Sequence, residues 1–436
     1  MPTLPDQDRK IPHVVIVGGG FGGLYAAKHL GNKPVRVTLV DRRNFHLFQP
    51  LLYQIAIGEL SPGDIATTLR ATFRHDPNIS VLMDEMTDLV PGMRQVQLRD
   101  EPEPLTYDYL ILATGSMPSY FGHDDTWAEH ATGLKSVEDA LDMRRQIFSA
   151  FEAAERERDP KKQAMLLTFV IIGGGPTGVE LAGALAELTH IGLKQDFRKI
   201  TPEQARILLV EASSRVLSTY PEELSKKAAE ALEKLGVTIR TGTTVTDIQE
   251  NVVTLSWEDS KEQVQASTIL WTAGVKASPM GVIISERAGL EPDRGGRVMV
   301  TSNCSVPGHP DIFVIGDLAN FSHTPNGKPL PGLAAVAIQQ GEYVAKLIQA
   351  KAQGKNLPPF QYQDKGILAV IGLNEAVADL GKFRFSGFLA WLVWALVHIR
   401  YLIEFDNRLM VMFQWFWTYI TRRTTARLIT GRQSYD

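Results

Sequence analysis

Two short stretches of the sequence decide its fold: HVVIVGGGFGG at residues 13–23 and FVIIGGGPTG at residues 169–178. Each is a continuous apolar run, rich in β-branched residues, that ends in a cluster of glycines. A run of this kind predicts a buried parallel strand. The first glycines of the two clusters, Gly18 and Gly173, lie 155 residues apart. The chain therefore builds the same turn twice.

The first turn has the spacing of a dinucleotide-binding loop. Gly18, Gly20 and Gly23 satisfy GxGxxG, and LYAAKHL continues as a helical pattern. The three glycines allow a tight turn, close approach of the backbone to a diphosphate, and close packing of helix on strand. The diphosphate would lie at the N-terminus of the helix, which favours anions. The next apolar run ends in Asp41, 18 residues after Gly23, where an acid can accept the ribose hydroxyls.

The second turn repeats this pattern with Gly173, Gly175 and Gly178, followed by the helical pattern VELAGALAELTH. The next predicted strand, ARILLV, ends in Glu211, 33 residues after Gly178, so an extended helix and loop should fill the gap. An acid at this place would repel a 2′-phosphate, which favours NADH over NADPH. Arg215, four residues further on, weakens this preference slightly. We interpret the two sites as one for a tightly held flavin and one for an exchanging nicotinamide, but the glycine patterns alone do not assign them.

Composition excludes several other classes of protein. The 436 residues suggest two to three domains, and the pI of about 6.2 argues against a nucleic-acid binder. The only cysteine, Cys304, rules out an internal disulfide and CxxC redox chemistry, and it fits a reducing compartment. We expect this thiol to be inert. No spacing typical of a metal site stands out, and the polar N-terminus lacks the apolar core of a signal peptide.

The order of four motifs resembles the two-dinucleotide-domain flavoproteins: the first glycine turn, YDYLILATGS (107–116), TILWTAGV (268–275) and DIFVIGDLA (311–319). The resemblance covers the chain to about residue 375 and implies that the N-terminal turn holds FAD and the internal turn holds NAD(P)H. The FAD residues that it implies are Gly18, Gly20, Gly23, Asp41, Thr114, Gly115, Gly316 and Asp317. Those for NADH are Gly173, Gly175, Gly178, Glu211 and Gly274.

A narrower resemblance, to type II NADH dehydrogenases (single-subunit NADH:quinone oxidoreductases), rests on the segments 45–62, 173–188, 331–345 and 362–372. It implies that Glu180 lies near the nicotinamide and the flavin, that Lys365 lies near the flavin, and that residues 334–339 line a quinone pocket. Gln339 matches the family's AQxAxQ pattern, but Ala335 replaces its first glutamine. The implied catalytic residues are Glu180, Gln339 and Lys365, and the implied quinone contacts are Ala335, Gln339, Gln340 and Lys365.

Plainer interpretations exist for each of these side chains. Glu180 could be an acid favoured in the first helical turn by the helix dipole. Gln339 and Gln340 could be helix-surface residues, and Lys365 a solvated loop residue. His46 has no carboxylate partner nearby in the sequence, so we expect it to be structural.

The C-terminal tail differs in composition from the rest of the chain. From Lys382 onward it has eight Lys or Arg against three Asp or Glu, and four of the seven tryptophans. Its apolar stretch 387–403 is short for a membrane span. The second apolar stretch is 409–420. Within it and at its two ends, polar residues form one stripe opposite the aromatics: Asn407, Gln414, Thr418 and Thr421. Three arginines come after it: Arg422, Arg423 and Arg427. This pattern favours a helix in a membrane interface, although a helix pair buried in a homodimer would also fit.

Together these features predict an α/β chain with two Rossmann-like domains, one inserted in the other, and a helical amphipathic membrane-associating tail. We expect FAD-binding parts at 11–120 and 286–350, an NADH-binding domain at 121–285, and a quinone and membrane segment at 351–436. The expected activity is FAD-dependent oxidation of NADH by a membrane quinone in respiratory electron transport, without proton pumping, at the cytoplasmic face of the membrane. The alternatives are a soluble NAD(P)H:ferredoxin or rubredoxin reductase, and a non-catalytic flavin sensor of the NADH/NAD ratio. Sulfide:quinone reductases share the fold but need redox cysteines.

Overall fold

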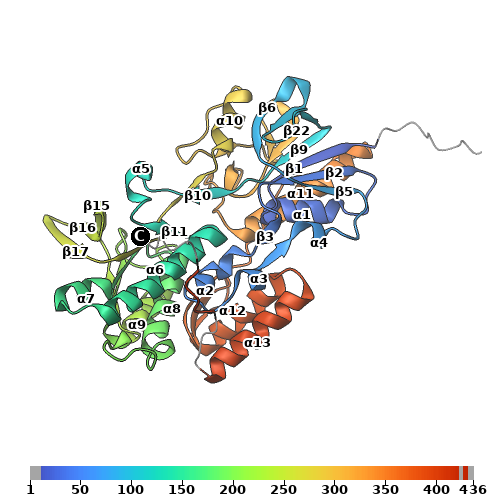
Figure 1. Ribbon diagram of the computed structural model, residues 1–436. Helices are drawn as coiled ribbons and strands as arrows, with labels where there is room; N and C mark the ends of the chain where they lie inside the picture. The colour runs from blue at the N-terminus through green and yellow to red at the C-terminus, as the bar shows by residue number, and fades with distance from the viewer. Residues whose placement is uncertain (1–10, 422–425, 431–436) are drawn as a thin grey trace, which may run out of the picture. The chain divides into compact units, whose positions relative to one another are not determined.

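The computed structural model describes residues 11–421 and 426–430 (Figure 1). Contacts within the chain divide these residues into two compact units. The first, called unit 1, contains residues 11–46, Thr67–Met117 and Val275–Asp364. The second, called unit 2, contains Leu47–Ala66, Pro118–Gly274 and the described residues from Lys365 onward. Arg422 and Arg423, expected to add positive charge after the second tail helix, lie outside the described residues.

Unit 1 is built on a six-stranded sheet in the order β21-β22-β9-β1-β2-β5. Strands β22, β9, β1, β2 and β5 are parallel, and β21 pairs antiparallel with β22. Because β1 is buried along its whole length, it reads as the continuous apolar run seen in the sequence. The strands are β1 (His13–Val17), β2 (Arg36–Asp41), β5 (Ile79–Met83), β9 (Tyr109–Leu112), β21 (Ser305–Val306) and β22 (His309–Val314).

Two helices of unit 1 pack closely because glycines face each other. Helix α1 (Phe21–Leu30) packs against α11 (Ala334–Ala352). A Cβ atom on Gly341 of α11 would lie 2.3 Å from the Gly22 carbonyl oxygen of α1. The unit also contains the sheet β6 (Met86–Val90), β7 (Gln95–Leu98) and β8 (Leu105–Thr106), the pair β20 (Val298–Met299) and β23 (Ala319–Asn320), and the helices α4 (Leu69–Thr72) and α10 (Met280–Arg287).

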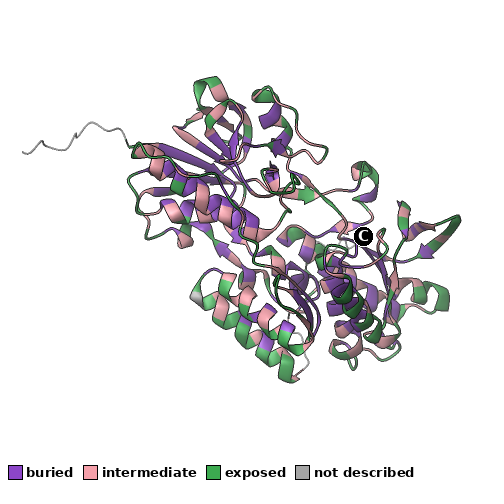
Figure 2. Ribbon diagram, turned by 180° about the vertical axis from the view of Figure 1, so that it is seen from behind, coloured by how far each residue is buried: buried purple, intermediate pink, exposed green. Residues whose placement is uncertain are grey.

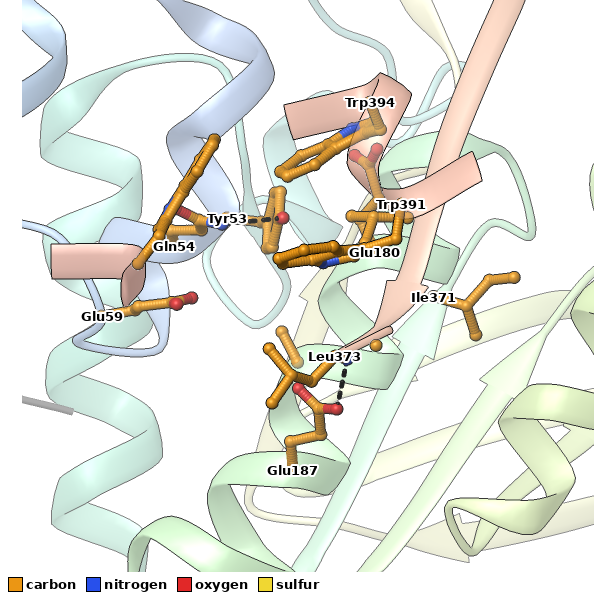
Figure 3. Close-up of a pocket in the computed structure, with 13 residues that line it drawn as sticks. Tyr53, Gln54, Glu59, Glu180, Glu187, Ile371, Leu373, Trp391 and Trp394 are labelled. Carbon is orange, nitrogen blue, oxygen red and sulfur yellow. Dashed lines mark hydrogen bonds between the residues drawn. The ribbon is translucent and has the colours of Figure 1, made fainter. Parts of the chain in front are cut away.

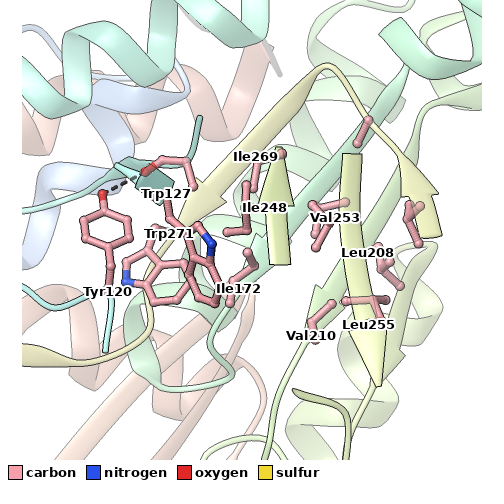
Figure 4. Packing of buried hydrophobic residues seen from close by; sticks show 14 residues of the cluster. Tyr120, Trp127, Ile172, Leu208, Val210, Ile248, Val253, Leu255, Ile269 and Trp271 are labelled. Carbon is pink, nitrogen blue, oxygen red and sulfur yellow. Dashed lines mark hydrogen bonds between the residues drawn. The ribbon is translucent and has the colours of Figure 1, made fainter. Parts of the chain in front are cut away.

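Unit 2 contains a second parallel sheet, in the order β11-β18-β12-β13-β14. A three-stranded antiparallel sheet, β15-β16-β17, packs with it around a cluster of buried residues that includes Trp127 and Trp271 (Figure 4). The strands are β11 (Thr132–Gly133), β12 (Thr168–Ile172), β13 (Arg206–Val210), β14 (Val237–Arg240), β15 (Thr244–Gln249), β16 (Val252–Trp257), β17 (Ser260–Gln265) and β18 (Thr268–Trp271). The helices of this part are α5 (Asp124–Trp127), α6 (Val137–Arg156), α7 (Pro160–Leu166), α8 (Pro176–Glu187) and α9 (Glu222–Lys234).

The C-terminal part of unit 2 adds a three-stranded antiparallel sheet and two helices. The sheet contains β24 (Ile367–Gly372), β25 (Glu375–Asp379) and β26 (Arg384–Ser386), and α12 (Phe388–Tyr401) and α13 (Phe405–Thr421) follow. The two apolar stretches predicted to be helical are therefore helices. Within the described residues, none of the helices has the length and hydropathy needed to cross a bilayer.

The unit boundaries differ from the expected domain boundaries most clearly in three places. Residues 47–66 belong to unit 2, because α2 (Leu52–Ala56) packs on α6 and α8; α3 (Pro62–Ile65) lies in the same segment. The chain returns to unit 1 at Val275 rather than at 286, because α10 packs on β6 and β20. Unit 1 extends to Asp364 rather than to 350, because Phe360 packs against Phe321 and Tyr343. The short pairs β3 (Phe45–Leu47) with β4 (Ala66–Thr68), and β10 (Ser116–Pro118) with β19 (Val275–Ala277), lie at these boundaries.

One glycine, Gly183, lets the C-terminal sheet pack closely against the nucleotide-binding part of unit 2. A Cβ atom on Gly183 of α8 would lie 1.6 Å from the Ile371 carbonyl oxygen of β24. Gly183→Ala must therefore push α8 and β24 apart, and we expect it to lower the free energy of unfolding by about 3 kcal/mol. Urea unfolding of this variant and of Gly63→Ala checks the prediction, since a Cβ on Gly63 meets no described atom within 4 Å. Equal midpoints for the two variants would contradict it.

Candidate active site

The first glycine turn joins β1 to α1 in unit 1 with the geometry that the sequence predicts. Gly18 has φ of +104°, which favours glycine. A Cβ on Gly23 would lie 1.8 Å from the Gly18 carbonyl oxygen, so only glycine lets the helix approach the strand. A Cβ on Gly20 would have no described atom within 4 Å, so the N-terminus of α1 is open. Among the described residues, no side chain caps this helix end. Its free N–H groups can therefore bind a diphosphate.

Two side chains hold this turn in place. Asp41 accepts hydrogen bonds from Gly19 N at 2.5 Å and from Arg43 N at 2.7 Å. Burial raises the pKa of the Asp41 carboxyl above its usual value, and these two hydrogen bonds oppose the shift. His46 bonds the Gly19 carbonyl oxygen through Nδ1 at 2.9 Å, and burial lowers the pKa of its imidazole to about 4. A neutral His46 that braces the backbone agrees with the structural role expected for it.

The other residues expected to contact FAD gather at the same edge of the sheet, because β1, β9 and β22 run parallel. Thr114 and Gly115 follow β9, and the Thr114 hydroxyl lies 2.6 Å from that of Ser278. Gly316, with φ of +70°, and Asp317 follow β22. Ser116 donates to Asp317 at 2.6 Å. The glycine turn after β1, the acid Asp41 at the end of β2 and the Gly-Asp pair after β22 therefore lie at the carboxyl ends of neighbouring strands. This is where such folds bind nucleotides. The residues fit FAD.

The second turn, in unit 2, has the same backbone geometry as the first. Gly173 has φ of +110°, and a Cβ on Gly178 would lie 1.8 Å from the Gly173 carbonyl oxygen. Gly175 is open like Gly20 and precedes α8, whose N-terminus is again not capped by any side chain that the structure describes. Glu211 takes the part of Asp41: it accepts from Gly174 N at 2.6 Å and from Ser213 N at 2.7 Å. The two copies therefore share the backbone geometry of the turn and the acid that supports it.

Gly274, expected at the NADH site, follows β18 at the carboxyl edge of the sheet of unit 2. Its φ is +69°, and the exposed ring of Phe121 lies over it, so that a Cβ would approach Phe121 to 2.6 Å. Arg215 donates to the carbonyl oxygens of Ser218 and Tyr220. This guanidinium is thus committed to its own loop, which supports the preference for NADH over NADPH.

Glu211→Gln tests that preference: it removes the negative charge, and it replaces one of the two acceptor oxygens by an NH2 group. We expect the Michaelis constant for NADH to rise about tenfold and the preference for NADH over NADPH to shrink, because a charged hydrogen bond to the ribose contributes about 1.5–3 kcal/mol. Steady-state kinetics with both nucleotides measures this. The matched control is Glu233→Gln, an exposed glutamate on α9 of the same unit. Unchanged constants for Glu211→Gln would remove this residue from the nucleotide site.

Glu180 lines a cavity of about 50 Å³ within unit 2 (Figure 3). It is the fifth residue of α8, beyond the first turn, and burial raises the pKa of its carboxyl to about 8. A helix dipole would lower that pKa, so stabilisation of the helix end does not explain this residue. The cavity lies between α2, α8, β24, α12 and α13, and its lining includes Tyr53, Glu59, Glu187, Trp391, Trp394 and Trp415.

The remaining expected site residues have protein partners. The Gln339 amide donates to the Gln363 carbonyl oxygen and accepts from Gln363 N, both at 2.9 Å. Lys365 is exposed and donates to the Tyr401 hydroxyl at 3.4 Å. Ala335 is half-buried near the start of α11. Gln339 lies in unit 1, whereas Glu180 and Lys365 lie in unit 2. Their catalytic and quinone-binding roles stay predictions.

Gln340 needs a correction. It was expected to contact the quinone, but it is 1% exposed, and its amide oxygen accepts from Gly316 N at 2.7 Å. It therefore fixes the Gly-Asp turn after β22 and presents no free surface. Cys304 is fully buried, and burial raises the pKa of its thiol, as expected for an inert cysteine.

Sequence reasoning missed Tyr53, Glu59 and Glu187. A weak signal was present: one tyrosine and one glutamate in the apolar run LLYQIAIGEL (51–60), in a segment that otherwise reads as core. Glu187 lies seven residues after Glu180, which is two turns of a helix and hence the same face. The association of α2 with α8 could not be read from the sequence.

Comparisons with known proteins agree with this geometry. Residues 12–341 match a family described as pyridine nucleotide-disulphide oxidoreductase, and residues 365–424 match the NDH2 C-terminal domain. A type II NADH:quinone oxidoreductase of Mycobacterium tuberculosis (strain ATCC 25618 / H37Rv) is 43% identical over 428 residues, which is 97% of this chain and 91% of that protein. The chain belongs to the type II NADH:quinone oxidoreductases. A member from Haemophilus influenzae is 32% identical over 84% of this chain and 87% of its own length.

Solved structures support the fold of this type II NADH:quinone oxidoreductase. NDH2 from Plasmodium falciparum in complex with NADH matches with a TM-score of 0.87 at 21% identity, over 97% of this chain and 100% of that one. A sulfide:quinone oxidoreductase from Aquifex aeolicus matches with a TM-score of 0.73 at 17% identity, over 91% of each chain. The expected α/β fold with two dinucleotide-binding domains is thereby confirmed, and so is the use of FAD and NADH.

Proposed function

We propose that this chain oxidises NADH through bound FAD and reduces a quinone by two electrons at the surface of a membrane, without pumping protons. Membership of the type II NADH:quinone oxidoreductases carries the activity. The duplicated glycine turn supports it, since one copy fits FAD and the other fits NADH. FAD, when bound, supplies the two-electron chemistry. The protein supplies binding by Gly18–Gly23 and Gly173–Gly178 and orientation by Asp41 and Glu211.

The orientation of α13 supports the membrane surface as the place of action. Its polar stripe faces inward: Gln414 and Thr418 are half-buried beside the buried Val411 and Trp415. Its apolar side faces outward, the reverse of a helix on a water-soluble surface (Figure 2). The exposed large apolar residues of α12 and α13 are Phe388, Leu389, Leu392, Leu396, Leu409, Met410, Met412, Phe413, Phe416, Trp417, Tyr419 and Ile420. A contiguous face of this kind is typical of a helix seated in the lipid interface.

The charge around these helices fits a lipid surface that carries negative charge. Lys382, Arg384 and Arg400 are exposed. We propose the cytoplasmic leaflet as the anionic surface, since it attracts basic residues near the interface. A membrane-bound quinone is the substrate that such a location serves.

Anaerobic flavin spectroscopy on detergent-purified protein tests the activity. Addition of NADH should bleach the flavin, and addition of a short-chain quinone should restore its absorbance. Bleaching without recovery would exclude quinone as the acceptor. It would favour a protein acceptor such as a ferredoxin, and absence of turnover with any acceptor would favour a sensor. Protein purified without flavin would overturn the assignment of the first glycine turn.

A further inference from the structure

One phenylalanine of unit 2 is exposed in a backbone conformation that bulky residues rarely adopt. Phe121 is 67% exposed and has φ of +54°. This left-handed region is costly for any residue with a Cβ, and most of all for one with a large side chain. Residues held in such a conformation gather at ligand-binding sites, where the surrounding structure keeps them in place. The conformation of Phe121 therefore points to a use for its ring.

The loop that carries Phe121 is held by the aromatic residues packed against it. Tyr120 is 7% exposed and stacks on Trp271 of β18, with the ring centroids 4.9 Å apart (Figure 4). Trp271 Nε1 donates to the Ser119 carbonyl oxygen at 3.0 Å, and Ser119 N donates to the Gly274 carbonyl oxygen at 3.3 Å. These contacts bury the ring of Tyr120 and leave the ring of Phe121 in solvent on a fixed base.

The ring of Phe121 lies beside the second glycine turn. Strands β18 and β12 are neighbours in the sheet, and the hydroxyl of Thr272, directly after β18, donates to the Gly173 carbonyl oxygen at 3.0 Å. Gly274 follows two residues later. A Cβ there would lie 2.6 Å from Phe121 Cζ, so the ring reaches this place only because residue 274 is a glycine. The ring therefore borders the place where the diphosphate of a nucleotide would bind.

The order of the strands decides which half of NADH meets this ring. In the sheet of unit 2, β12 lies between β13 and β18. The diphosphate site is the N-terminus of α8, which follows β12, and Glu211, the acid for the adenosine ribose, follows β13. The adenosine half therefore extends from the diphosphate toward β13. The nicotinamide half extends the other way, toward the end of β18, where Phe121 lies.

We propose that Phe121 is a substrate-binding residue whose ring packs against the nicotinamide riboside of NADH. The proposal rests on the proposed function and adds a contact outside the glycine turn and its acid. The planar nicotinamide ring suits the face of a phenyl ring, because stacked rings gain free energy beyond the area that they bury. Single apolar residues on a surface are common. Such a residue needs neither a strained backbone nor a rigid base with a glycine under the ring.

Phe121→Ala tests the contact, since it removes the ring and keeps the rest of the site. The measurement is calorimetric titration of the flavin-containing protein in detergent with two probes. The first is tetrahydro-NADH, whose nicotinamide ring cannot give up hydride, and the second is ADP, which lacks the nicotinamide riboside. We expect the dissociation constant of tetrahydro-NADH to rise about tenfold, the scale found when an aromatic stack with a base is lost, and that of ADP to stay unchanged. The Michaelis constant for NADH should rise with the first. An equal loss for ADP, or no loss for either probe, would overturn the contact.

Phe121→Gly separates a ligand-binding ring from a structural one. Glycine adopts a positive φ without strain, and a residue that is 67% exposed gives up little burial. The urea midpoint of this variant should therefore equal or exceed that of the wild type, while its affinity for tetrahydro-NADH falls as in Phe121→Ala. A midpoint below that of the wild type would mark the ring as part of the fold and would overturn its assignment to the ligand.

Two further variants separate this contact from general effects on the protein. Phe383→Ala removes a phenylalanine of unit 2 that is 69% exposed and has no positive φ, and it should bind both probes as the wild type does. Gly274→Ala introduces a methyl group that displaces the ring of Phe121, so its effect on tetrahydro-NADH should shrink in the Phe121→Ala background. Full additivity of these two substitutions would contradict the contact. A wild type that oxidises no NADH would defeat the proposed function, whereas an unchanged Michaelis constant for NADH in Phe121→Ala would defeat only the assignment of its ring.

Discussion

Gly178→Ala is expected to lower the rate of flavin reduction by NADH about 100-fold while the flavin stays bound. The new Cβ would lie 1.8 Å from the Gly173 carbonyl oxygen and 2.7 Å from Thr272 Oγ1, so α8 must move away from β12. A displacement near 1 Å is enough for a loss of about 100-fold in a positioned reaction. Rapid-mixing measurement of flavin bleaching at fixed NADH gives the rate directly. The flavin site is in unit 1, so its occupancy should not change.

The equivalent substitution in the other turn should have the opposite outcome. In Gly23→Ala the Cβ would lie 1.8 Å from the Gly18 carbonyl oxygen, and we expect protein that purifies without flavin. Gly63→Ala, in an open position of unit 2, is the matched control. If Gly178→Ala lost the flavin, or Gly23→Ala kept it and failed only with NADH, the assignment of the two turns would be reversed.

Replacing both Phe413 and Phe416 by glutamate is expected to release the protein from lipid vesicles. These side chains are 60% and 61% exposed on the outer face of α13. Burying a phenylalanine contributes about 1.5–3 kcal/mol, so losing two should weaken vesicle binding by at least about 100-fold. Flotation with vesicles that contain anionic lipid measures this. Turnover with a water-soluble quinone should be retained, because the inner face of the helix, with Val411 and Trp415, is unchanged.

The matched control replaces two exposed apolar residues of unit 1, Met93 and Val282, by glutamate. This variant should float with the vesicles as the wild type does. Continued flotation of the Phe413/Phe416 variant would contradict the membrane interpretation. If that variant also halved the particle mass in detergent, α13 would be a dimer contact, which was the alternative that the sequence left open.

The sequence by itself determined the two nucleotide sites. An apolar strand, a glycine turn and a helix lie within a few residues of one another, so their geometry is local: Gly18 and Gly173 need positive φ, and Gly23 and Gly178 need to lack a Cβ, whatever surrounds them. The acids Asp41 and Glu211 were predictable for the same reason, since Asp41 is the last residue of the next parallel strand in the first copy and Glu211 directly follows it in the second. The tail helices were also readable, because their apolar stretches are long.

Only the tertiary structure decided the features that depend on contacts between distant segments of the chain. Gln340 looked like a surface glutamine beside Gln339. Because α11 packs close to the turn at Gly316, however, the amide oxygen of Gln340 accepts a hydrogen bond from Gly316 N. The direction of the α13 polar stripe was equally undetermined, since a periodic pattern gives two faces without saying which one packs inward. Tyr53, Glu59 and Glu180 are more than 100 residues apart in the chain at their extremes. They share one cavity only because α2 packs on α8, a contact between distant segments that depends on side-chain shape rather than on local pattern.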